Sequence, residues 1–207
     1  MTTAETAFVG DIHGNVTALD GLARLILNDP TVKHTVFLGD YVNKGADSAG
    51  VLDRLLRISE THAVTVLRGN HEAEMLKALD AGDLAAFLKL GGATTIKSYV
   101  RRPVGADVIA DFRSSVPADH VRFLRAMPDV YQTEQVVASH RPWTDGGTRF
   151  RISAHVPVGD YPVVGADFAH LDTGCSSSSG RLTALRWPSR TFTQVDSTGR
   201  PVGRDES

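Results

Sequence analysis

Three short segments in the first part of the chain carry side chains that are well suited to hold metal ions. They read GDIHGN from Gly10, GDYVNKG from Gly39 and RGNHE from Arg68. Their aspartate, histidine and asparagine side chains suit first-row divalent ions such as manganese, iron or zinc. The chain contains one cysteine, so no set of thiolates is available to select a softer metal. The segments therefore indicate metal-dependent chemistry, provided that the fold brings them together.

Each segment follows a stretch whose composition predicts a β-strand, and the connections between these stretches predict helices. Apolar residues keep helical spacing within residues 15–27 and again from Val51 to Ile58, where Asp47 or Ser48 is the expected N-cap. A β-α-β-α-β order implies a parallel sheet with right-handed crossovers. Such sheets bind ligands at the carboxyl ends of their strands, so we expect the three segments to meet in one crevice.

The second half of the chain has a different pattern. Residues 71–127 are mostly helical with a break at residues 91–92, and after Gln135 the strands follow one another closely, as in an antiparallel or mixed sheet. We therefore expect an α/β (α+β) fold in which two sheets pack face to face with helices outside. Residues 1–196 are expected to form a single domain, and residues 197–207 a flexible C-terminal tail. The predicted strands are residues 7–10, 35–39, 63–67, 135–139, 150–154, 169–174, 182–187 and 191–195.

Two later histidines, His140 and His155, also stand at the ends of predicted strands. They add two imidazoles to the carboxylate, imidazole and amide ligands of the first three segments. One aspartate can bridge two ions about 3.5–4 Å apart, and such a pair clamps the attacking and leaving oxygens of an in-line displacement. We assign this bridge to Asp40. A second bridge would be water, whose pKa the ions lower so that hydroxide is available near neutral pH.

The three segments, in this order, resemble the signature blocks of the calcineurin-like metallophosphoesterases, and in particular the bacterial and phage type of phosphoprotein phosphatase. The similarity continues through LGGATTIKSY, VVASH, SAHVP, LDTGC and GRLTALRW, and it covers the chain from Phe8 to Val195. It implies a four-layer α/β/β/α metallophosphoesterase sandwich of two mixed β-sheets flanked by helices. It also implies hydrolysis of phosphomonoesters by metal-activated hydroxide, with Ser/Thr phosphoproteins as the first expected substrates.

Two other functions stay open at this point. A close branch of the same superfamily hydrolyses dinucleoside polyphosphates such as diadenosine tetraphosphate with the same signature blocks. A weakly active or non-catalytic relative would bind metal or phosphoprotein without turnover. The expected cofactors are two divalent metal ions, Mn2+ first, with Fe or Zn as alternatives. The expected partner is a phosphorylated protein or a small phosphoester, and the sequence leaves the oligomeric state undefined.

The resemblance also implies a role for individual residues. The implied metal ligands are Asp11, His13, Asp40 and His155 for one ion, and Asp40, Asn70 and His140 for the other. Arg68 and Lys44 would bind the phosphoryl oxygens, and His71 would protonate the leaving oxygen. A histidine suits that role because its unperturbed pKa is near 6.5.

The second segment departs from the family pattern at two positions. Asn43 stands where the family has an aspartate that pairs with the acid histidine, and Lys44 stands where it has an arginine. An amide can orient His71 by accepting its N–H, but it lacks the negative charge that stabilises imidazolium. Lys44 keeps the positive charge without the planar fork that binds two phosphate oxygens. We therefore expect a slow enzyme whose pH optimum is lower than in relatives with the carboxylate.

The connection between the two late histidines is shorter than in the family, where it carries a second phosphate-binding arginine. Arg141, Arg149 and Arg151 are the candidates, and the sequence does not choose among them.

Simple structural roles are expected for several other residues. Glu72 is interpreted as a charge that complements the dipole of the following helix, and Cys175 as a small buried residue. Trp143 and Trp187 are expected to pack against the fold, and Trp143 can also rim the substrate groove. Arg68 has a simple alternative role, a salt bridge to a neighbouring carboxylate. The histidines expected at the surface or in packing are His34, His62, His120 and His170.

The composition argues against other classes of protein. The chain is 42% hydrophobic and 22% charged, which is typical of a soluble globular protein. Its net charge of −2 gives no basic surface for nucleic acid, and no apolar run reaches the ~20 residues of a membrane span. The single cysteine and the absence of a signal-like N-terminal segment lead us to expect a cytoplasmic location, with no nucleic-acid or membrane partner.

Overall fold

The computed structural model describes residues 4–144 and 147–203, and it begins with the expected β-α-β-α-β order. The elements of this first part are β1 (Glu5–Val9), α1 (Val16–Ile26), β2 (Val32–Phe37), α2 (Ser48–Thr61) and β3 (Val64–Val66). The helices that follow are α3 (Asn70–Ala81), α4 (Ala85–Lys89), α5 (Gly92–Tyr99), α6 (Val108–Ser115) and α7 (Ala118–Ala126). The last strands are β4 (Val130–Gln132), β5 (Val136–Ser139), β6 (Phe150–Ser153), β7 (Val163–Val164), β8 (Phe168–His170), β9 (Arg181–Trp187), β10 (Phe192–Asp196) and β11 (Pro201–Val202).

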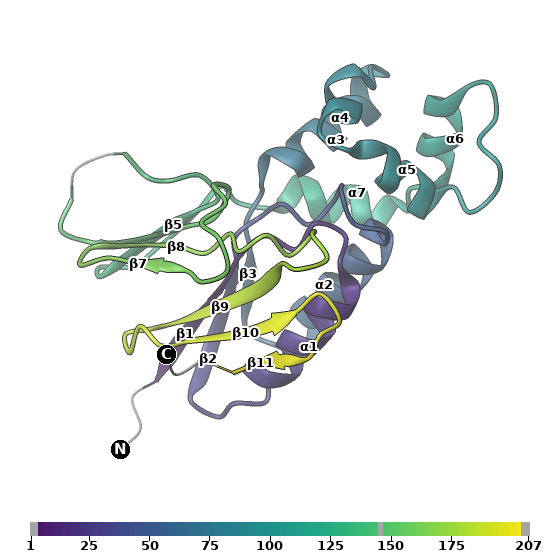
Figure 1. The fold of residues 1–207 in the computed structure, drawn as a ribbon. Coiled ribbons are helices and arrows are strands. Elements are labelled where there is room, and N and C mark those ends of the chain that lie inside the picture. The colour runs from purple at the N-terminus through teal and green to yellow at the C-terminus, as the bar shows by residue number, and fades with distance from the viewer. Residues whose placement is uncertain (1–3, 145–146, 204–207) are drawn as a thin grey trace.

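Two mixed sheets face one another, as Figure 1 shows. The six-stranded sheet has the order β11-β10-β9-β1-β2-β3, in which β1, β2 and β3 are parallel and β9 runs antiparallel to β1. The five-stranded sheet has the order β4-β5-β6-β8-β7, with a parallel centre and an antiparallel strand at each edge. The predicted fold of two mixed sheets flanked by helices is confirmed.

The central strand β1 is buried on both of its faces. Phe8 points between the sheets, where it belongs to one core with Val36 and Ile152. Its neighbours Ala7 and Val9 belong to the core on the opposite face, which α1 and α2 cover. This alternation follows from the two-residue period of a strand. It explains why β1 reads as a continuous apolar run, which is typical of a parallel strand covered on both sides.

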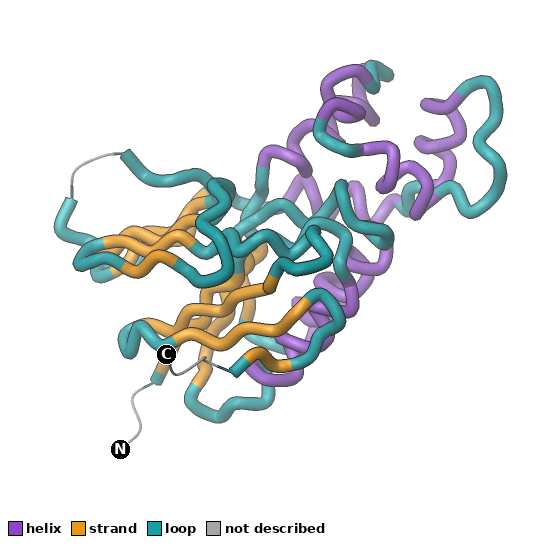
Figure 2. The backbone as a smooth tube through the Cα atoms, in the orientation of Figure 1, coloured by secondary structure: helices purple, strands orange, loops and turns teal. Residues whose placement is uncertain are grey.

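Helices α1 and α2 begin where the sequence indicates. Asn15 Oδ1 accepts a hydrogen bond from the backbone N–H of Ala18 at 3.0 Å, and Asp47 Oδ1 accepts one from Gly50 at 2.9 Å. Each helix therefore starts with a side-chain cap. Figure 2 shows these two helices along the six-stranded sheet and the other helices gathered toward one end of the sandwich. The helices of the described ranges thus lie outside the pair of sheets, along the six-stranded sheet and at one end of the sandwich, without a separate layer over the five-stranded sheet.

The chain beyond Asp196 returns to the six-stranded sheet, which differs from the predicted tail. Pro201 and Val202 form β11 and pair with β10 in antiparallel fashion. Asp196 Oδ1 accepts hydrogen bonds from the backbone N–H groups of Thr198 and Arg200 at 2.8 and 3.0 Å, which closes a turn between the two strands. The rest of the predicted tail, residues 204–207, lies outside the described residues.

The sequence pattern misses three strands and overextends one. The strands β4, β7 and β11 have three, two and two residues, which is too short for an alternating pattern to identify them. The strand predicted over residues 169–174 ends at His170, so Asp172 lies in a loop. Among the residues that the structure describes, every helix is too short or too polar to reach across a membrane.

Candidate metal centre

The six predicted metal ligands meet beyond the carboxyl ends of five strands. Two follow β1, and one each follows β2, β3, β5 and β6; they are Asp11, His13, Asp40, Asn70, His140 and His155. Backbone contacts join the first two loops, because the N–H groups of Ile12 and His13 donate to the carbonyl oxygen of Asp40 at 3.2 and 2.9 Å. The expected convergence of the three signature segments is therefore present.

One cluster of potential ligands is fully buried and consists of His13, Asp40 and His71. Their candidate ligand atoms all lie within 4.8 Å of one another. His13 Nε2 also lies 3.6 Å from Asp11 Oδ2. The other ring nitrogen, His13 Nδ1, lies 3.1 Å from the carbonyl oxygen of Val42. A proton on Nδ1 donates to that carbonyl and leaves Nε2 with a lone pair for a metal ion.

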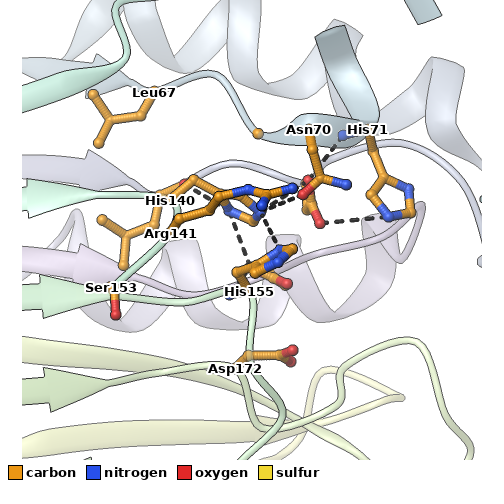
Figure 3. Close-up of polar contacts among 12 residues, drawn as sticks. Leu67, Asn70, His71, His140, Arg141, Ser153, His155 and Asp172 are labelled. Atoms are coloured by element: carbon orange, nitrogen blue, oxygen red, sulfur yellow. Dashed lines mark hydrogen bonds and ion pairs between the residues drawn. The ribbon is translucent and has the colours of Figure 1, made fainter. Parts of the chain in front are cut away.

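A second cluster consists of Asp40, His140 and His155, again with ligand atoms within 4.8 Å of one another. His140 Nε2 lies 3.2 Å from Asp40 Oδ1, 3.0 Å from Asn70 Oδ1 and 3.1 Å from His155 Nδ1. Figure 3 shows the side chains of Asn70, His140 and His155 pointing toward one another. His140 Nδ1 lies 3.1 Å from the carbonyl oxygen of Leu38, so this ring is oriented in the same way as His13.

Asp40 belongs to both clusters, which is the arrangement that a bridging ligand requires. His155 is placed differently from its expected group, because its ring approaches His140 and not His13. Its backbone N–H nevertheless donates to Asp11 Oδ1 at 3.4 Å. His155 therefore connects the two halves of the site.

Two carboxylates at the centre of the site lie almost completely out of water. Asp11 and Asp40 are 3% and 2% exposed. Burial, followed by the charges of Asp40 and Asp172, raises the pKa of Asp11. Burial alone would raise the pKa of Asp40 as well, but the hydrogen bond and charge of His140, with the nearby histidines His71 and His13, lower it below the usual value. Buried anions need a compensating charge, so this donor set fits divalent cations.

The backbone of the site adopts a conformation that side chains rarely take. Six described residues other than glycine have φ in the left-handed region, and five of them belong to the predicted constellation. These five are His13, Asp40, Asn43, Lys44 and His155, with φ of 47°, 56°, 71°, 62° and 68°. Such residues cost about 1–3 kcal/mol each and persist where surrounding contacts impose them. The fold therefore keeps local strain at the position where the ligand atoms converge.

Gly69 allows the loop before α3 to pass directly beside the shared ligand. A Cβ atom at this position would lie 2.2 Å from Asp40 Oδ1. At Gly39, where φ is +113°, a Cβ atom would lie 2.8 Å from the Cα of Gly69. Both glycines are required for this close approach.

Glu72 has a larger role than the predicted helix-start charge. It is completely buried, and its carboxylate accepts four backbone N–H groups that come from two loops. Oε2 accepts from Asp40 at 2.8 Å and Gly69 at 2.9 Å, and Oε1 accepts from Tyr41 at 2.7 Å and Val42 at 3.1 Å. Burial and the charge of Asp40 raise the pKa of Glu72 to about 7. The predicted helix-start position is present, because Glu72 lies in the first turn of α3 and accepts the N–H of Gly69, but the interpretation as a simple dipole charge is incomplete. The side chain also fastens the Asp40 loop to the start of α3.

His71 contacts Asn43, as expected, but the hydrogen bond has the opposite polarity. The Asn43 amide nitrogen lies 2.9 Å from His71 Nδ1, while Asn43 Oδ1 accepts from the hydroxyl of Thr95 at 2.8 Å. The amide therefore donates to Nδ1, which places the ring proton on Nε2. Burial lowers the pKa of His71, and the charge of Asp40 opposes this effect while Lys44 adds to it.

The two predicted phosphate-binding cations occupy different places. Lys44 Nζ lies 2.8 Å from His13 Nε2, beside the buried cluster. Arg68 forms an ion pair with Asp129, through Nε at 3.0 Å and Nη2 at 2.7 Å to the same carboxylate oxygen. The simple alternative for Arg68, a salt bridge, is thus present. Its side chain also lines the cavity next to the second cluster.

The structure distinguishes the three candidate arginines of the short connection. Arg149 binds the side chain of Gln132, and Arg151 pairs with Asp167. Arg141 lines the same cavity as Asn70 and His140, and Figure 3 shows its side chain running past His140. Its charge also contributes to lowering the pKa of His155, after burial and His140. Arg141 is therefore the candidate that lies beside the ligand clusters.

Asp172 is a residue of the site that the sequence analysis did not assign. It is 3% exposed, and its Oδ1 accepts the backbone N–H of Gly174 at 3.0 Å. Its charge contributes to raising the pKa values of Asp11 and Cys175. The segment LDTGC was part of the family resemblance, and its aspartate was the available signal. The four histidines expected to be structural, His34, His62, His120 and His170, lie outside both ligand clusters.

A family model described as "Calcineurin-like phosphoesterase" matches residues 5–159, which is most of the chain. The chain belongs to this family. The match includes all six predicted metal ligands and the segments that carry them, so the two clusters described above are the candidate ligands of a metal-dependent family. The family model ends before Asp172 and the strands β7 to β11.

Individual relatives of the family point to more than one activity. The chain is 33% identical over 84 residues to serine/threonine-protein phosphatase 2 of Escherichia coli, which covers 41% of this chain and 37% of the relative. It is 40% identical over 70 residues to a symmetrical bis(5'-nucleosyl)-tetraphosphatase of Acidovorax, which covers 34% and 24% of the two chains. The chain thus spans well under half the length of these relatives.

The fold is similar to that of solved structures along almost its whole length. A putative diadenosine tetraphosphatase superposes with a TM-score of 0.67 at 21% identity, covering 98% of this chain and 95% of the other. A metallophosphoesterase from Sphaerobacter thermophilus gives a TM-score of 0.59 at 14% identity, covering 94% and 89%. At these identities the similarity shows the metallophosphoesterase fold.

Proposed function

We propose that this protein is a metal-dependent hydrolase of phosphomonoesters, most directly a Ser/Thr protein phosphatase. The observation that carries the proposal is Asp40, whose carboxylate belongs to both ligand clusters. Two divalent ions bound there would neutralise phosphoryl charge and lower the pKa of a water molecule. We propose Mn2+ as the preferred ion, with Fe or Zn as alternatives. The proposed ligands are Asp11, His13, Asp40, Asn70, His140 and His155.

The cations around the clusters are proposed to hold the phosphoryl group. Arg68 and Arg141 line the cavity that adjoins Asn70 and His140, and Lys44 lies beside His13. Phosphoryl transfer depends mainly on positioning and on stabilisation of charge. Cations on two sides of the clusters would orient the phosphoryl group and stabilise its negative charge. The ammonium group of Lys44 provides a positive charge but cannot bind two phosphate oxygens at once. The planar guanidinium groups of the two arginines can do so.

His71 is proposed to assist departure of the leaving oxygen, oriented by Asn43. The Asn43 amide donates to Nδ1, so the Nε2–H of the ring can donate a hydrogen bond to that oxygen. Full proton transfer requires the imidazolium form, which burial disfavours. This supports a slow enzyme with a pH optimum below that of a relative with a carboxylate at position 43.

A second candidate activity is hydrolysis of dinucleoside polyphosphates. Relatives named bis(5'-nucleosyl)-tetraphosphatase match part of the chain, and a cavity large enough for a small organic molecule adjoins the second cluster. We further propose a single catalytic domain in the cytoplasm that acts on a phosphorylated protein or a small phosphoester.

The proposal can be tested with p-nitrophenyl phosphate as a general substrate. Chelated protein is assayed after addition of Mn2+, Zn2+, Fe2+ or Mg2+, for the wild type, His71→Asn and the matched surface variant His62→Asn. We expect metal-dependent hydrolysis of p-nitrophenyl phosphate by all three proteins, and a lower rate of His71→Asn on a phosphoserine peptide, whose leaving oxygen needs a proton. Metal uptake without hydrolysis under any of these conditions would instead identify a non-catalytic binding protein. Parallel assays with a phosphoserine peptide and diadenosine tetraphosphate then rank the two substrate classes.

A further inference from the structure

A cavity of about 440 Å³ opens directly beside the second ligand cluster. His140 belongs both to the cluster and to the wall of the cavity, and Asn70, whose Oδ1 lies 3.0 Å from His140 Nε2, lines the cavity beside it. A substrate whose phosphoryl group contacts these residues would therefore place the rest of its structure in this space. The volume lies within the range of roughly 300–1,000 Å³ that is usual for small-molecule sites.

The walls of the cavity combine an aromatic surface with charges of both signs. Trp143 lines one part, and Arg68, Arg141 and Asp129 line others. Trp187, the second tryptophan, stacks on Phe150 with ring centroids 4.7 Å apart. In the part of the chain that the structure describes, no aromatic ring packs on Trp143 in this way. Trp143 is half-buried and lines the cavity, so part of its side chain faces that space, whereas Trp187 is used in packing.

We propose that this cavity binds the nucleoside of a nucleoside polyphosphate, with the base against Trp143 and the phosphate chain along Arg141 and Arg68. The inference rests on the proposed function, since it requires a phosphoryl group at the ligand clusters. An indole provides a flat surface on which any nucleobase can stack. The Arg141 guanidinium and the remaining N–H donors of Arg68, whose Nε and Nη2 are held by Asp129 Oδ1, can bind phosphate oxygens. Asp129 Oδ2 can accept a hydrogen bond from a sugar hydroxyl or an exocyclic amino group.

The same surfaces fit a phosphoserine peptide less well. The ester of a serine or threonine carries an aliphatic carbon next to its oxygen, and it offers the indole no planar ring. A phosphoserine peptide carries one phosphate, and the residues around the ligand clusters are sufficient to bind it. The aromatic wall and the two arginines therefore offer a nucleotide contacts that a phosphorylated side chain does not use.

Tryptophan fluorescence provides a test that does not depend on catalysis. The chain has two tryptophans, so Trp187→Phe leaves Trp143 as the only one, and phenylalanine preserves a ring to stack on Phe150. The chelated protein is titrated with ATP. We expect saturable quenching in Trp187→Phe and none in Trp143→Phe, which retains Trp187. Absence of quenching in Trp187→Phe, or equal quenching in both variants, would refute the proposed position of the base.

Substrate competition provides the second test, with diadenosine tetraphosphate and a phosphoserine peptide as substrates. Trp143→Ala should lower kcat/KM for the dinucleotide about tenfold more than for the peptide, mainly through KM, because stacking on an aromatic side chain is lost. Trp143→Phe should recover most of the loss, and Trp187→Phe should leave the ratio unchanged. An equal loss for the two substrates would show that Trp143 is merely structural.

A phosphotyrosine peptide distinguishes a nucleoside from any aromatic leaving group. If Trp143→Ala impairs phosphotyrosine as strongly as the dinucleotide, the cavity recognises a ring and not a nucleoside, and the proposal is wrong. Failure of the proposed function has a different signature, because the wild type would then hydrolyse no p-nitrophenyl phosphate with any metal. Quenching by ATP would be unaffected by that result.

Discussion

The two ligand clusters share Asp40 but differ in their surroundings. His13 and His71 are 2% and 5% exposed; His13 lies in the loop after β1 and His71 in the first turn of α3, which follows β3. The other cluster takes His140 and His155 from the five-stranded sheet and adjoins the cavity. Both departures from the family pattern lie beside the buried cluster. Asn43 contacts His71, and Lys44 contacts His13. One half of the site is therefore enclosed by its own loops, and the other half faces the space available to substrate.

Removal of the shared carboxylate should abolish both clusters at once. Asp40→Asn keeps the shape of the side chain and removes its charge, so we expect both ions to bind weakly and kcat/KM on p-nitrophenyl phosphate to fall on the order of a thousandfold. Metal content after desalting and the hydrolysis rate are the measurements. Asp20→Asn, which alters a surface pair with Arg54, is the control. Retention of metal and activity by Asp40→Asn would show that the clusters do not depend on a common ligand.

Loosening the loop that carries the shared ligand should have a smaller effect on both clusters. In Glu72→Gln one acceptor oxygen becomes an NH2 group that faces backbone N–H groups, so about two buried donors lose their partner at a cost of about 1–3 kcal/mol each. We expect lower stability in urea unfolding and about a 10- to 100-fold loss of metal affinity, as for other residues that orient ligands.

The matched control for this variant is Glu74→Gln, which changes an exposed pair with Lys77 on the same helix. If Glu72→Gln unfolded at the same urea concentration as the control and bound Mn2+ equally well, the four hydrogen bonds would not be what positions Asp40.

Glu72 also shows which properties of the site are visible in a sequence. The convergence of the candidate ligands could be predicted because each follows a recognisable strand, and parallel strands bring their ends to one edge. The contacts of the Glu72 side chain could not be predicted. In a sequence, an acidic residue at a helix start looks the same whether its side chain faces solvent or the backbone of another loop. Its four partners become neighbours only after the strands β2 and β3 have paired.

The part of the site that comes from residues after Gln135 was harder to predict for the same reason. Arg141, Arg149 and Arg151 are equivalent in sequence, and their difference arises from partners on neighbouring strands, such as Gln132 and Asp167. The strands β4, β7 and β11 are too short to carry a pattern. Local sequence thus predicted the order of elements and the positions of the candidate ligands. Contacts between distant segments determine which partners the three arginines have.

The enclosed cluster can be altered alone through the partner of His71. Asn43→Asp replaces an amide that donates to Nδ1 by a carboxylate that accepts from it, which stabilises the imidazolium. The pKa of His71 is lowered by burial, so the protonated acid is lost as pH rises through that value. Raising the pKa by about one would increase the protonated fraction, and the rate on phosphoserine, up to about tenfold at neutral pH. The pH optimum should move upward.

The leaving group separates this effect from a general change in the site. p-Nitrophenolate departs without a proton, so the rate on p-nitrophenyl phosphate should change much less than the rate on phosphoserine. The measurement is a pair of pH–rate profiles for each protein. An equal response of the two substrates, or a slower reaction on phosphoserine, would contradict the proposed pairing of Asn43 with the acid.

The smallest effect is expected from Lys44, the other departure in the enclosed cluster. Its ammonium group lies 2.8 Å from His13 Nε2, the nitrogen that would bind a metal ion, so it should oppose metal binding there. Because the side chain is exposed, an interaction of about 0.2–1 kcal/mol is expected, and Lys44→Ala should bind Mn2+ about two- to fivefold more tightly. Calorimetric titration of chelated protein measures this, with Lys77→Ala as the surface control. A rise in affinity confined to one of two binding steps would place the competition in the enclosed cluster, whereas unchanged or weaker binding would mean that Lys44 does not compete with the ion.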